Sequence, residues 1–162
     1  YIQKTIKLFK SNYLKLFNLS KIKTKDQLPF FSSYWPRLND KVHGWINWNW
    51  SGEQIINFIN AFDNPYCGAQ TKYRKKTIHL KNCFFDNLDG NFHPFQSGII
   101  FRISDNYLAV STEGGTLNIG EIYNENGSLI SKSKFKIGDR LITPLKILDN
   151  AIETRVFYSP KK

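Results

Sequence analysis

The sequence has no methionine, only two cysteines and three histidines, and no long hydrophobic run. A helix that crosses a membrane needs about 20 mostly apolar residues, so the chain offers no candidate span, and no stretch reads as a signal peptide. Cys67 and Cys83 match no zinc-ligand spacing, and sparse cysteines are typical of a reducing compartment. We therefore expect free thiols, no metal site, no contact with a membrane and a cytoplasmic location.

Residues that could carry out a reaction are also scarce. No Gly-x-Ser-x-Gly elbow, phosphate-binding loop or dinucleotide fingerprint is present. His43, His79 and His93 are far apart, and His79 falls in an expected strand, where a half-exposed position is predicted. Asp86 and Asp89 are close in sequence, but they lie beside a glycine turn and are expected to be solvated. We predict no catalytic residue in this chain.

The residues that are abundant indicate one packed domain. The chain has 162 residues, of which 41% are hydrophobic and 15% aromatic, so it is long and apolar enough for a real core. The formal net charge is +10, with basic clusters at residues 4–25, 72–81 and 132–140. This charge favours either a polyanion-binding surface or a solvated face rich in lysine, which supplies 18 of the 23 basic residues.

Two helices separated by a linker are expected in the first part of the chain. Apolar residues recur at helical spacing over 1–17, which predicts an amphipathic helix that needs a partner surface. Prolines and turn residues at 18–42 predict a linker. Ser51 and Gln54 form a capping box for a second helix, which we expect to end at Asn64-Pro65. Its predicted buried stripe is Ile55, Ile59 and Phe62.

Beyond Pro65 the hydrophobic period changes from that of a helix to that of a strand, which predicts short strands separated by tight turns. The expected strands are 77–83, 98–103, 107–111, 116–123 and 129–135, with turns at Asp89-Gly90, Asp105-Asn106, Gly114-Gly115 and Asn126-Gly127. Residues 136–144 would add a last turn and a short extended segment. The predicted fold class is mainly β with α: a small antiparallel OB-like barrel or sandwich, preceded by an amphipathic helix, a linker and a short capped helix.

One long motif, "YWPRLNDKVHGWINWNWSGEQIINFINAFDNPYCGAQT" at residues 34–71, resembles the joining region of the formyltransferase family. This family includes methionyl-tRNA formyltransferases and the N-formyltransferases of nucleotide-linked amino sugars. Asn47 stands where the family usually has aspartate, and Asn60 where it usually has arginine. The matching positions are Pro36, Arg37, Asp40, Gly44, Ile46, Trp48, Ile55, Ala61, Pro65, Tyr66, Gly68 and Ala69.

The resemblance implies an enzyme that transfers a formyl group from 10-formyltetrahydrofolate to an amine. In that family a preceding domain binds the folate and supplies the base and the oxyanion donors. The chain begins with Tyr1 rather than methionine and so looks like a fragment, and the resemblance implies that residues 1–19 are the last helix of that N-terminal catalytic domain. Residues 20–50 would then be the linker and joining region, and 51–162 a C-terminal formyltransferase-like domain, inactive on its own.

Roles are expected for individual side chains of the motif. Tyr66 follows a helix-ending proline, in a loop position where functional side chains are often displayed. Trp48, which lies between Trp45 and Trp50 in "GWINWNW", is interpreted as a packing anchor between linker and barrel, with base stacking by a tryptophan as the alternative. The further structural positions are Gly44, Pro65 and Gly68. The expected border of the substrate pocket is Tyr66, Trp35 and Arg37.

Three kinds of function stay open. The stretch "NFHPFQSGIIFR" at residues 91–102 looks more like the amino-sugar enzymes, so a nucleotide-sugar substrate is preferred. In a methionyl-tRNA formyltransferase, the barrel and its lysines would hold tRNA. A stand-alone OB-like binding module would leave the apolar stripe of the first helix exposed. A homodimer of the parent enzyme is compatible with the first two.

Overall fold

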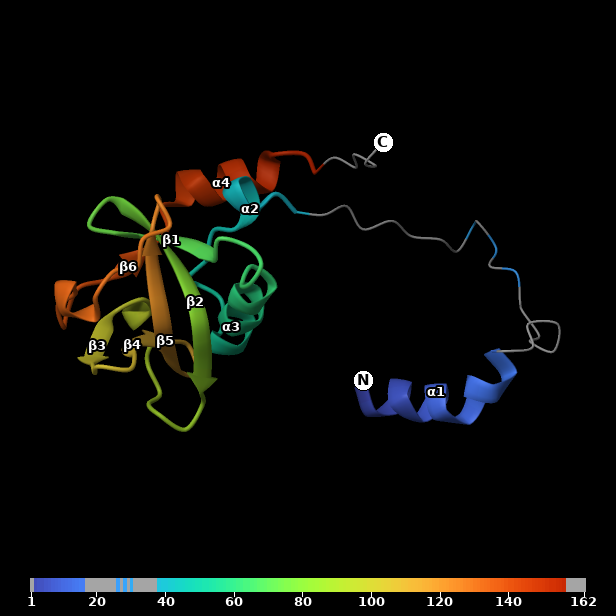
Figure 1. The fold of residues 1–162 in the computed structure, drawn as a ribbon. Helices are drawn as coiled ribbons and strands as arrows, with labels where there is room; N and C mark the ends of the chain where they lie inside the picture. The colour runs from blue at the N-terminus through green and yellow to red at the C-terminus, as the bar shows by residue number, and fades with distance from the viewer. Residues whose placement is uncertain (1, 17–25, 27, 29, 31–37, 157–162) are drawn as a thin grey trace. The chain divides into compact units, whose positions relative to one another are not determined.

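The computed structural model describes residues 2–16, 26, 28, 30 and 38–156, which belong to two units (Figure 1). In the first unit, α1 spans Ile2–Leu16 and is amphipathic, as the sequence predicts. Its apolar stripe is exposed at Ile2, Ile6, Phe9 and Tyr13. No helix within the described ranges is long and apolar enough to cross a membrane.

The second unit is built on a curled antiparallel sheet in the order β3-β4-β5-β2-β1-β6. Backbone hydrogen bonds join its two edges, because Ile100 N donates to the Asp139 carbonyl at 2.9 Å and Leu141 N donates to the Gly98 carbonyl at 2.8 Å. The sheet is therefore an OB-like barrel, as predicted. Its strands are β1 (Ala69–Tyr73), β2 (Lys76–Asp86), β3 (Ile100–Ile103), β4 (Leu108–Thr112), β5 (Gly115–Asn124) and β6 (Leu141–Ile142).

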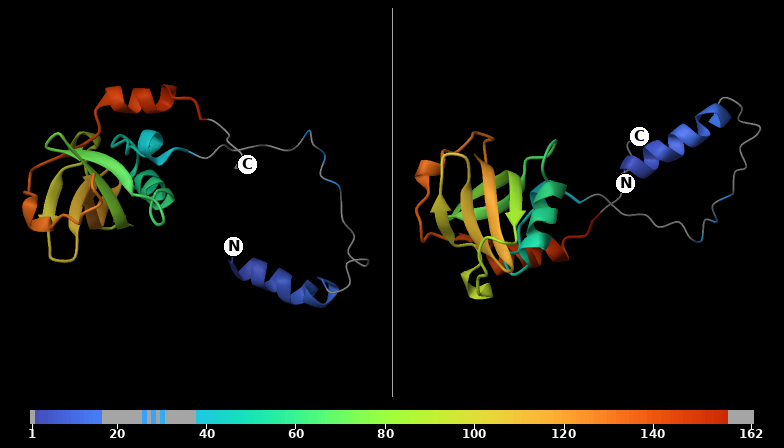
Figure 2. Two further views of the ribbon diagram at one scale, coloured as in Figure 1. Left: turned by 45° about the horizontal axis from the view of Figure 1, so that its top comes forward. Right: turned by 90° about the horizontal axis from the view of Figure 1, so that it is seen from below.

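Helices cover the barrel, and α3 is the one that the sequence predicts. Both views of Figure 2 show α3 beside β2. The predicted capping box is present, since Gln54 N donates to Ser51 Oγ at 3.3 Å and Ser51 N donates to Gln54 Oε1 at 3.1 Å. Ile55 and Ile59 are fully buried, and the helix ends before the predicted Asn64-Pro65. The helical elements of this unit are α2 (Asp40–His43), α3 (Gly52–Ala61), α4 (Leu145–Glu153) and the 3-10 turns η3 (Pro94–Gln96) and η4 (Lys132–Lys134).

Trp48 lies in the barrel core together with buried residues of α3 and the strands. Its side chain is 7% exposed, and its indole Nε1 donates a hydrogen bond to Thr71 Oγ1 at 2.9 Å. Ser97 Oγ donates to the Trp48 carbonyl at 2.6 Å, which ties the segment to the start of β3. Because its N–H has a hydrogen-bond partner, the indole is buried without the free-energy cost of an unpaired donor. Trp48 therefore joins the segment before α3 to the barrel.

The other two tryptophans of the cluster have different surroundings. The ring of Trp50 meets that of Phe58 edge-on at 5.1 Å between centroids, on the edge of the core. Trp45 is half-buried on the outer side of the barrel, where Lys72 Nζ lies 5.6 Å from its ring centroid. The three rings therefore do not share one face, because residues 47–50 form a turn.

In the long strands β2 and β5, the side chains that face the core switch from one side of the strand pair to the other. The switch occurs where Asn82 lies opposite Gly120. Asn82 has a φ of 50°, and a Cβ on Gly120 would lie 2.4 Å from the Asn82 carbonyl oxygen. The core takes Leu80 and Ile122 on one side of this point, and Ile119 on the other. Glycine at position 120 thus permits the close backbone approach that lets one pair of strands curl round the core.

The predicted strand at 129–135 is wrong. Leu129 forms only an isolated bridge, and Ser131 Oγ then accepts a hydrogen bond from Ser133 N, which caps η4 and ends the extended backbone. Phe135 leaves this turn toward the core and is 4% exposed. The prediction that Asp89-Gly90 forms a hairpin turn between two strands is also wrong. It begins the longer connection from β2 to β3 that contains η3.

The structure contains a strand, two α-helices and two 3-10 turns that the sequence reasoning did not predict: β1, α2, α4, η3 and η4. The hairpin after β1 turns at Arg74 and Lys75, whose φ values are 47° and 70°. This left-handed turn normally takes asparagine and glycine, so its usual signal is absent. In α4, by contrast, Leu145, Leu148 and Ile152 recur at helical spacing after a proline, a signal that the sequence does contain.

Candidate functional site

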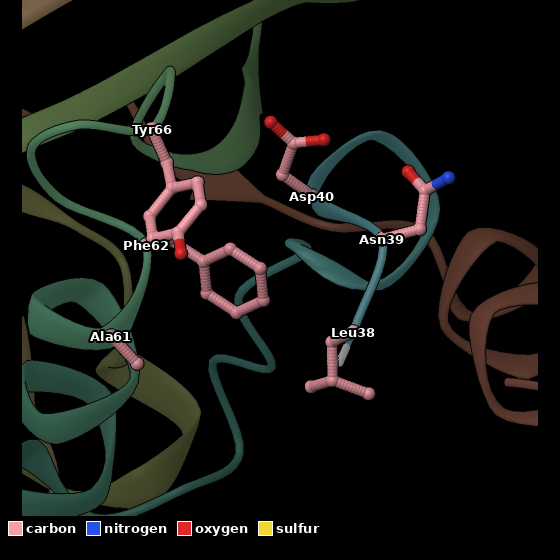
Figure 3. A pocket seen from close by; sticks show the side chains of 6 residues that line it. All are labelled: Leu38, Asn39, Asp40, Ala61, Phe62 and Tyr66. Carbon is pink, nitrogen blue, oxygen red and sulfur yellow. The ribbon is translucent and has the colours of Figure 1, made fainter. Parts of the chain in front are cut away.

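A hollow of about 560 Å³ lies between α2 and the C-terminal end of α3 (Figure 3). The rings of Phe62 and Tyr66 lie together on one side, and Leu38 and Asp40 lie across from them. The full lining is Leu38, Asn39, Asp40, Ala61, Phe62 and Tyr66. All of these residues belong to the motif at 34–71, so the hollow, called the α2–α3 hollow below, forms where the two ends of that motif meet.

Local hydrogen bonds fix Asp40 at the start of α2. Asn39 caps the helix, because its Oδ1 accepts a hydrogen bond from Lys41 N at 3.0 Å. The same amide also donates to Asp40 Oδ1 at 2.9 Å. The helix ends at Gly44, where a Cβ would lie 2.4 Å from the Asp40 carbonyl oxygen. Glycine at this position therefore lets the chain leave α2 close to the backbone of Asp40.

The loop after α3 carries Tyr66 into the hollow. Gly68 N donates to the Phe62 carbonyl at 3.0 Å, which closes the loop on the end of the helix. Gly68 has a φ of +99°, and a Cβ there would lie 2.7 Å from Lys81 and 2.8 Å from the Leu80 carbonyl oxygen. Only glycine fits both the backbone conformation and the space, so Gly68 fixes the position of the loop.

Hydrogen bonds from β1 and the loop hold the two sides of the hollow together. The Gln70 side-chain amide donates to the Asp40 carbonyl at 2.6 Å, and Cys67 Sγ donates to Asp40 Oδ2 at 3.3 Å. Gln70 N donates to the Gly44 carbonyl at 2.6 Å, and Ile46 N donates to the Gln70 carbonyl at 2.9 Å. The segment after α2 therefore runs beside the start of β1, and this pairing sets the width of the hollow.

Lys81 on β2 fastens the same loop from outside. Its Nζ donates to Asn64 Oδ1 at 2.6 Å and to the Tyr66 carbonyl at 2.8 Å, and lies 3.8 Å from Asp63 Oδ1. The Lys81 side chain is only 12% exposed. Its charge is therefore paired and largely withdrawn from solvent, and it acts as a structural tie behind Tyr66.

The chemistry of the lining suits orientation of a bound group. The hydrogen bond to Asp40, then burial and the charge of the same carboxylate, raise the pKa of the Cys67 thiol. A raised pKa keeps the thiol protonated near neutral pH, so Cys67 is a hydrogen-bond donor and not a nucleophile. In the described part of the chain, no cluster of three or more His, Cys, Asp or Glu side chains could hold a metal ion. The hollow offers the rings of Phe62 and Tyr66, the Tyr66 hydroxyl and the Asp40 carboxylate.

The residues predicted to border a substrate pocket are distributed as follows. Tyr66 lines the α2–α3 hollow. Trp35 and Arg37 lie outside the described residues, although Arg37 directly precedes Leu38 of the lining. Pro65 is exposed in the loop that carries Tyr66.

Tyr66 is the one lining residue that was among the predicted site residues, and two of the other five, Asp40 and Phe62, show what the sequence did and did not reveal. Asp40 matches the family motif, so the signal for it was present in the sequence. Phe62 was assigned to the buried stripe of α3, and it is indeed only 6% exposed. Because its ring closes the core and also forms the wall of the hollow, helical spacing alone could not show its second role.

The histidines and the acidic pair have structural partners outside the hollow. His79 is half-exposed on β2, as predicted. A ring nitrogen of His43 lies 3.2 Å from the Thr154 carbonyl, and His93 caps η3. Asp86 Oδ1 accepts a backbone hydrogen bond within its turn, and Asp89 pairs with Arg102.

Comparison with protein families identifies the class of this domain. The sequence model described as "Formyl transferase, C-terminal domain" matches residues 39–140 and so spans α2, α3 and β1–β5. This match covers well over half of the chain, and the chain belongs to this family. The resemblance of the 34–71 motif is thereby confirmed. A search of curated proteins finds no match.

Solved structures support the same fold. HypX from Aquifex aeolicus in complex with tetrahydrofolic acid superposes with a TM-score of 0.51 at 16% sequence identity, over 75% of this chain and 21% of HypX. A variant of HypX with four substitutions gives a TM-score of 0.52 at 16% identity, again over 75% of this chain and 21% of that chain. The chain thus spans about a fifth of these proteins, and at this identity the likeness concerns the fold.

Proposed function

We propose that this chain is the C-terminal part of an N-formyltransferase that uses 10-formyltetrahydrofolate, and that the α2–α3 hollow borders the place where the amine substrate binds. The observation that carries this proposal is the convergence of both ends of the family motif on one hollow, with Asp40 and Tyr66 facing it. The structure of HypX in complex with tetrahydrofolic acid supports a folate-linked donor. The free cysteines Cys67 and Cys83 fit a reducing compartment and hence a cytoplasmic enzyme.

The residues of the hollow fit a substrate wall better than a folate site. Formyl transfer to an amine needs a base for the amine proton and donors for the tetrahedral oxyanion. Both oxygens of the Asp40 carboxylate already accept hydrogen bonds within the fold, from Cys67 Sγ and from the Lys41 amide, so this carboxylate is engaged as a structural acceptor. We therefore assign folate binding and catalysis to a preceding domain of the same protein, against which the exposed stripe of α1 would pack.

For the substrate, we favour the amine of a nucleotide-linked amino sugar over methionyl-tRNA. The similarity of residues 91–102 to the amino-sugar enzymes supports this choice. The Tyr66 ring, with Phe62 beside it in the wall, suits the face of a planar base or a sugar, and Asp40 and the Tyr66 hydroxyl suit hydroxyl groups. Arg37, which directly precedes Leu38 in the sequence, is proposed to meet the diphosphate with its guanidinium fork.

Kinetics on the full-length protein test this proposal. With 10-formyltetrahydrofolate as donor, transfer to nucleotide-linked amino sugars should exceed transfer to methionyl-tRNA. Tyr66→Phe removes only the phenolic hydroxyl and keeps the ring, and it should raise KM for the amine about three- to tenfold with little change in kcat. The matched control is Tyr123→Phe, whose hydroxyl donates to Glu121 Oε2 at 2.7 Å outside the hollow, and which should leave KM unchanged.

Two results would contradict the proposal at different levels. Equal KM values for the wild type and Tyr66→Phe would remove the hollow from the substrate site while leaving the reaction itself in place. Absence of formyl transfer to either class of amine by the intact protein would contradict the reaction.

A further inference from the structure

Two of the basic clusters that are separate in the sequence meet at one hollow of the barrel. This hollow, about 680 Å³ in volume, lies at the hairpin between β1 and β2, beside the turn after β5 and the η4 segment. We call it the hairpin hollow. Glu125 is the single carboxylate of its lining. The cations that line it are Arg74, Lys75, Lys76 and Lys134.

The positive charge of the hairpin hollow is mostly unpaired. Arg74 forms an ion pair with Asp139 at 2.7 Å, but Lys75, Lys76 and Lys134 form none with the residues that the structure describes. These three lysines are exposed, so their ammonium groups face solvent. Such a concentration of one sign around a concave surface attracts anions.

The hairpin backbone is unusual for the residues that it carries. Arg74 and Lys75 both have positive φ values, 47° and 70°, in a tight turn that asparagine and glycine fill best. Side chains with a Cβ are strained there, and strain of this kind concentrates at functional positions. A basic pair in this turn therefore points to a use for its charges.

Arg74 is also held in place before any ligand arrives. Its guanidinium and the Tyr73 hydroxyl both donate to Asp139 Oδ2, each at 2.7 Å. The guanidinium lies 5.2 Å from the Tyr73 ring centroid. Because Asp139 takes only one side of the guanidinium, the remaining N–H groups stay available to an anion.

The floor of the hollow is apolar. Ile78 and Phe135 are 2% and 4% exposed and belong to the core, and Ile130 is half-buried against it. The Tyr73 ring packs on Phe135 at 4.5 Å between centroids. An apolar floor with a cationic rim is the arrangement expected for an organic anion, because each part of the ligand then meets a complementary surface.

We propose that the hairpin hollow binds a small organic polyphosphate, with its phosphate groups at Arg74, Lys75, Lys76 and Lys134 and its organic part on the apolar floor. Lysine ammonium groups act as point charges for phosphate oxygens, and the arginine fork adds directed hydrogen bonds. The site goes beyond the proposed formyl transfer. It shares no lining residue with the α2–α3 hollow and lies at the other end of β1.

A small ligand fits better than a nucleic-acid strand because carboxylates interrupt the positive surface on the neighbouring strands. On the outer face of the neighbouring strands, Glu121 lies beside the Tyr123 hydroxyl, and Asp63 lies beside Lys81. A phosphate backbone that ran from the hairpin hollow along β2 and β5 would pass these carboxylates. Nucleic-acid binding needs an extended row of cations along its path, and on this face carboxylates alternate with the next cations, Lys72 and Lys81.

Titration of the full-length protein with inorganic pyrophosphate tests the phosphate part of the proposal. We expect saturable binding that weakens with added salt, and an affinity about fivefold lower in Lys75→Gln/Lys76→Gln. The matched control is Lys7→Gln/Lys146→Gln, which removes the same charge from positions that do not line the hollow. A second titration with a nucleoside diphosphate should give tighter binding than pyrophosphate, because the apolar floor then contributes.

Three outcomes would overturn the proposal. The first is an absence of pyrophosphate binding by the wild type, and the second is equal affinity in the wild type and in Lys75→Gln/Lys76→Gln. The third is tighter binding of a single-stranded RNA than of the nucleoside diphosphate, with the same variant abolishing it. That result would assign the hollow to nucleic acid. Melting temperatures of all variants, measured alongside, show whether a loss of binding reflects the site or a loss of folding.

Discussion

The two ends of the β1–β2 hairpin use the same type of residue in opposite ways. At the end near Tyr66, Lys81 is 12% exposed and its ammonium group has acceptors on the loop after α3. At the turn, Lys75 and Lys76 are exposed and form no ion pair with a described residue. Lysine that is paired and buried holds a loop in place, whereas lysine that is exposed and unpaired is available to a ligand.

The largest expected effect comes from removing the Lys81 side chain, which holds the loop after α3 in place. Lys81→Ala leaves Asn64 Oδ1 and the Tyr66 carbonyl without their shared donor and Asp63 without its ion-pair partner, and should lower the free energy of unfolding by about 2–3 kcal/mol. Lys76→Ala is the matched change at the hairpin end and should stay within about 0.5 kcal/mol. Urea unfolding of the two variants compares them directly, and equal losses would contradict the difference between the two ends.

A smaller effect of opposite sign is expected at the turn itself. Lys75→Gly places the residue that tolerates φ of 70° at that position, and should raise the free energy of unfolding by about 0.5–1 kcal/mol. The same change removes a cation from the hairpin hollow and should weaken pyrophosphate binding. Thermal unfolding and titration of one sample check both. A variant that is less stable than the wild type would contradict strain at Lys75. A variant that binds pyrophosphate as tightly as the wild type would contradict a role of Lys75 in anion binding.

The smallest effect concerns pH. Hydrogen bonding from Tyr73, and then from Arg74, lowers the pKa of Asp139 in the folded protein. A lowered pKa contributes stability above the unfolded value of about 3.9, and this contribution disappears as the pH falls through the folded pKa. Between pH 7 and about pH 3, the wild type should therefore lose more stability than Asp139→Asn. Urea midpoints at the two pH values measure this difference. Equal losses of stability in the wild type and in Asp139→Asn would show that the Asp139 carboxylate does not stabilise the hairpin.

Local patterns predicted the elements whose causes are local. The capping box of Ser51 and Gln54 and the alternation in β2–β5 were correct because hydrogen bonds and packing within each element enforce them. The strand at 129–135 was wrong because the Ser131 hydroxyl competes for the backbone, which alternation does not reveal. β1 was missed because the Arg74-Lys75 turn carries no asparagine or glycine.

The candidate sites depend on contacts that no local pattern contains. The α2–α3 hollow exists because Gln70 and Cys67 bond to Asp40, about 30 residues earlier in the chain. The family motif pointed to Tyr66 by resemblance, but the pairing that sets the shape of the hollow appears only in the fold. The hairpin hollow likewise joins two basic clusters that look like separate solvated segments in the sequence.

The central claim is that this domain works as one part of a larger formyltransferase, and the intact mass of the native product tests it most directly. An antibody raised against the domain would isolate the product from its source cells for mass spectrometry. The account predicts a mass well above 18.9 kDa, with room for a further folate-binding domain on the order of 150 residues. A mass of 18.9 kDa would contradict it, because this chain has no residues assigned to catalysis.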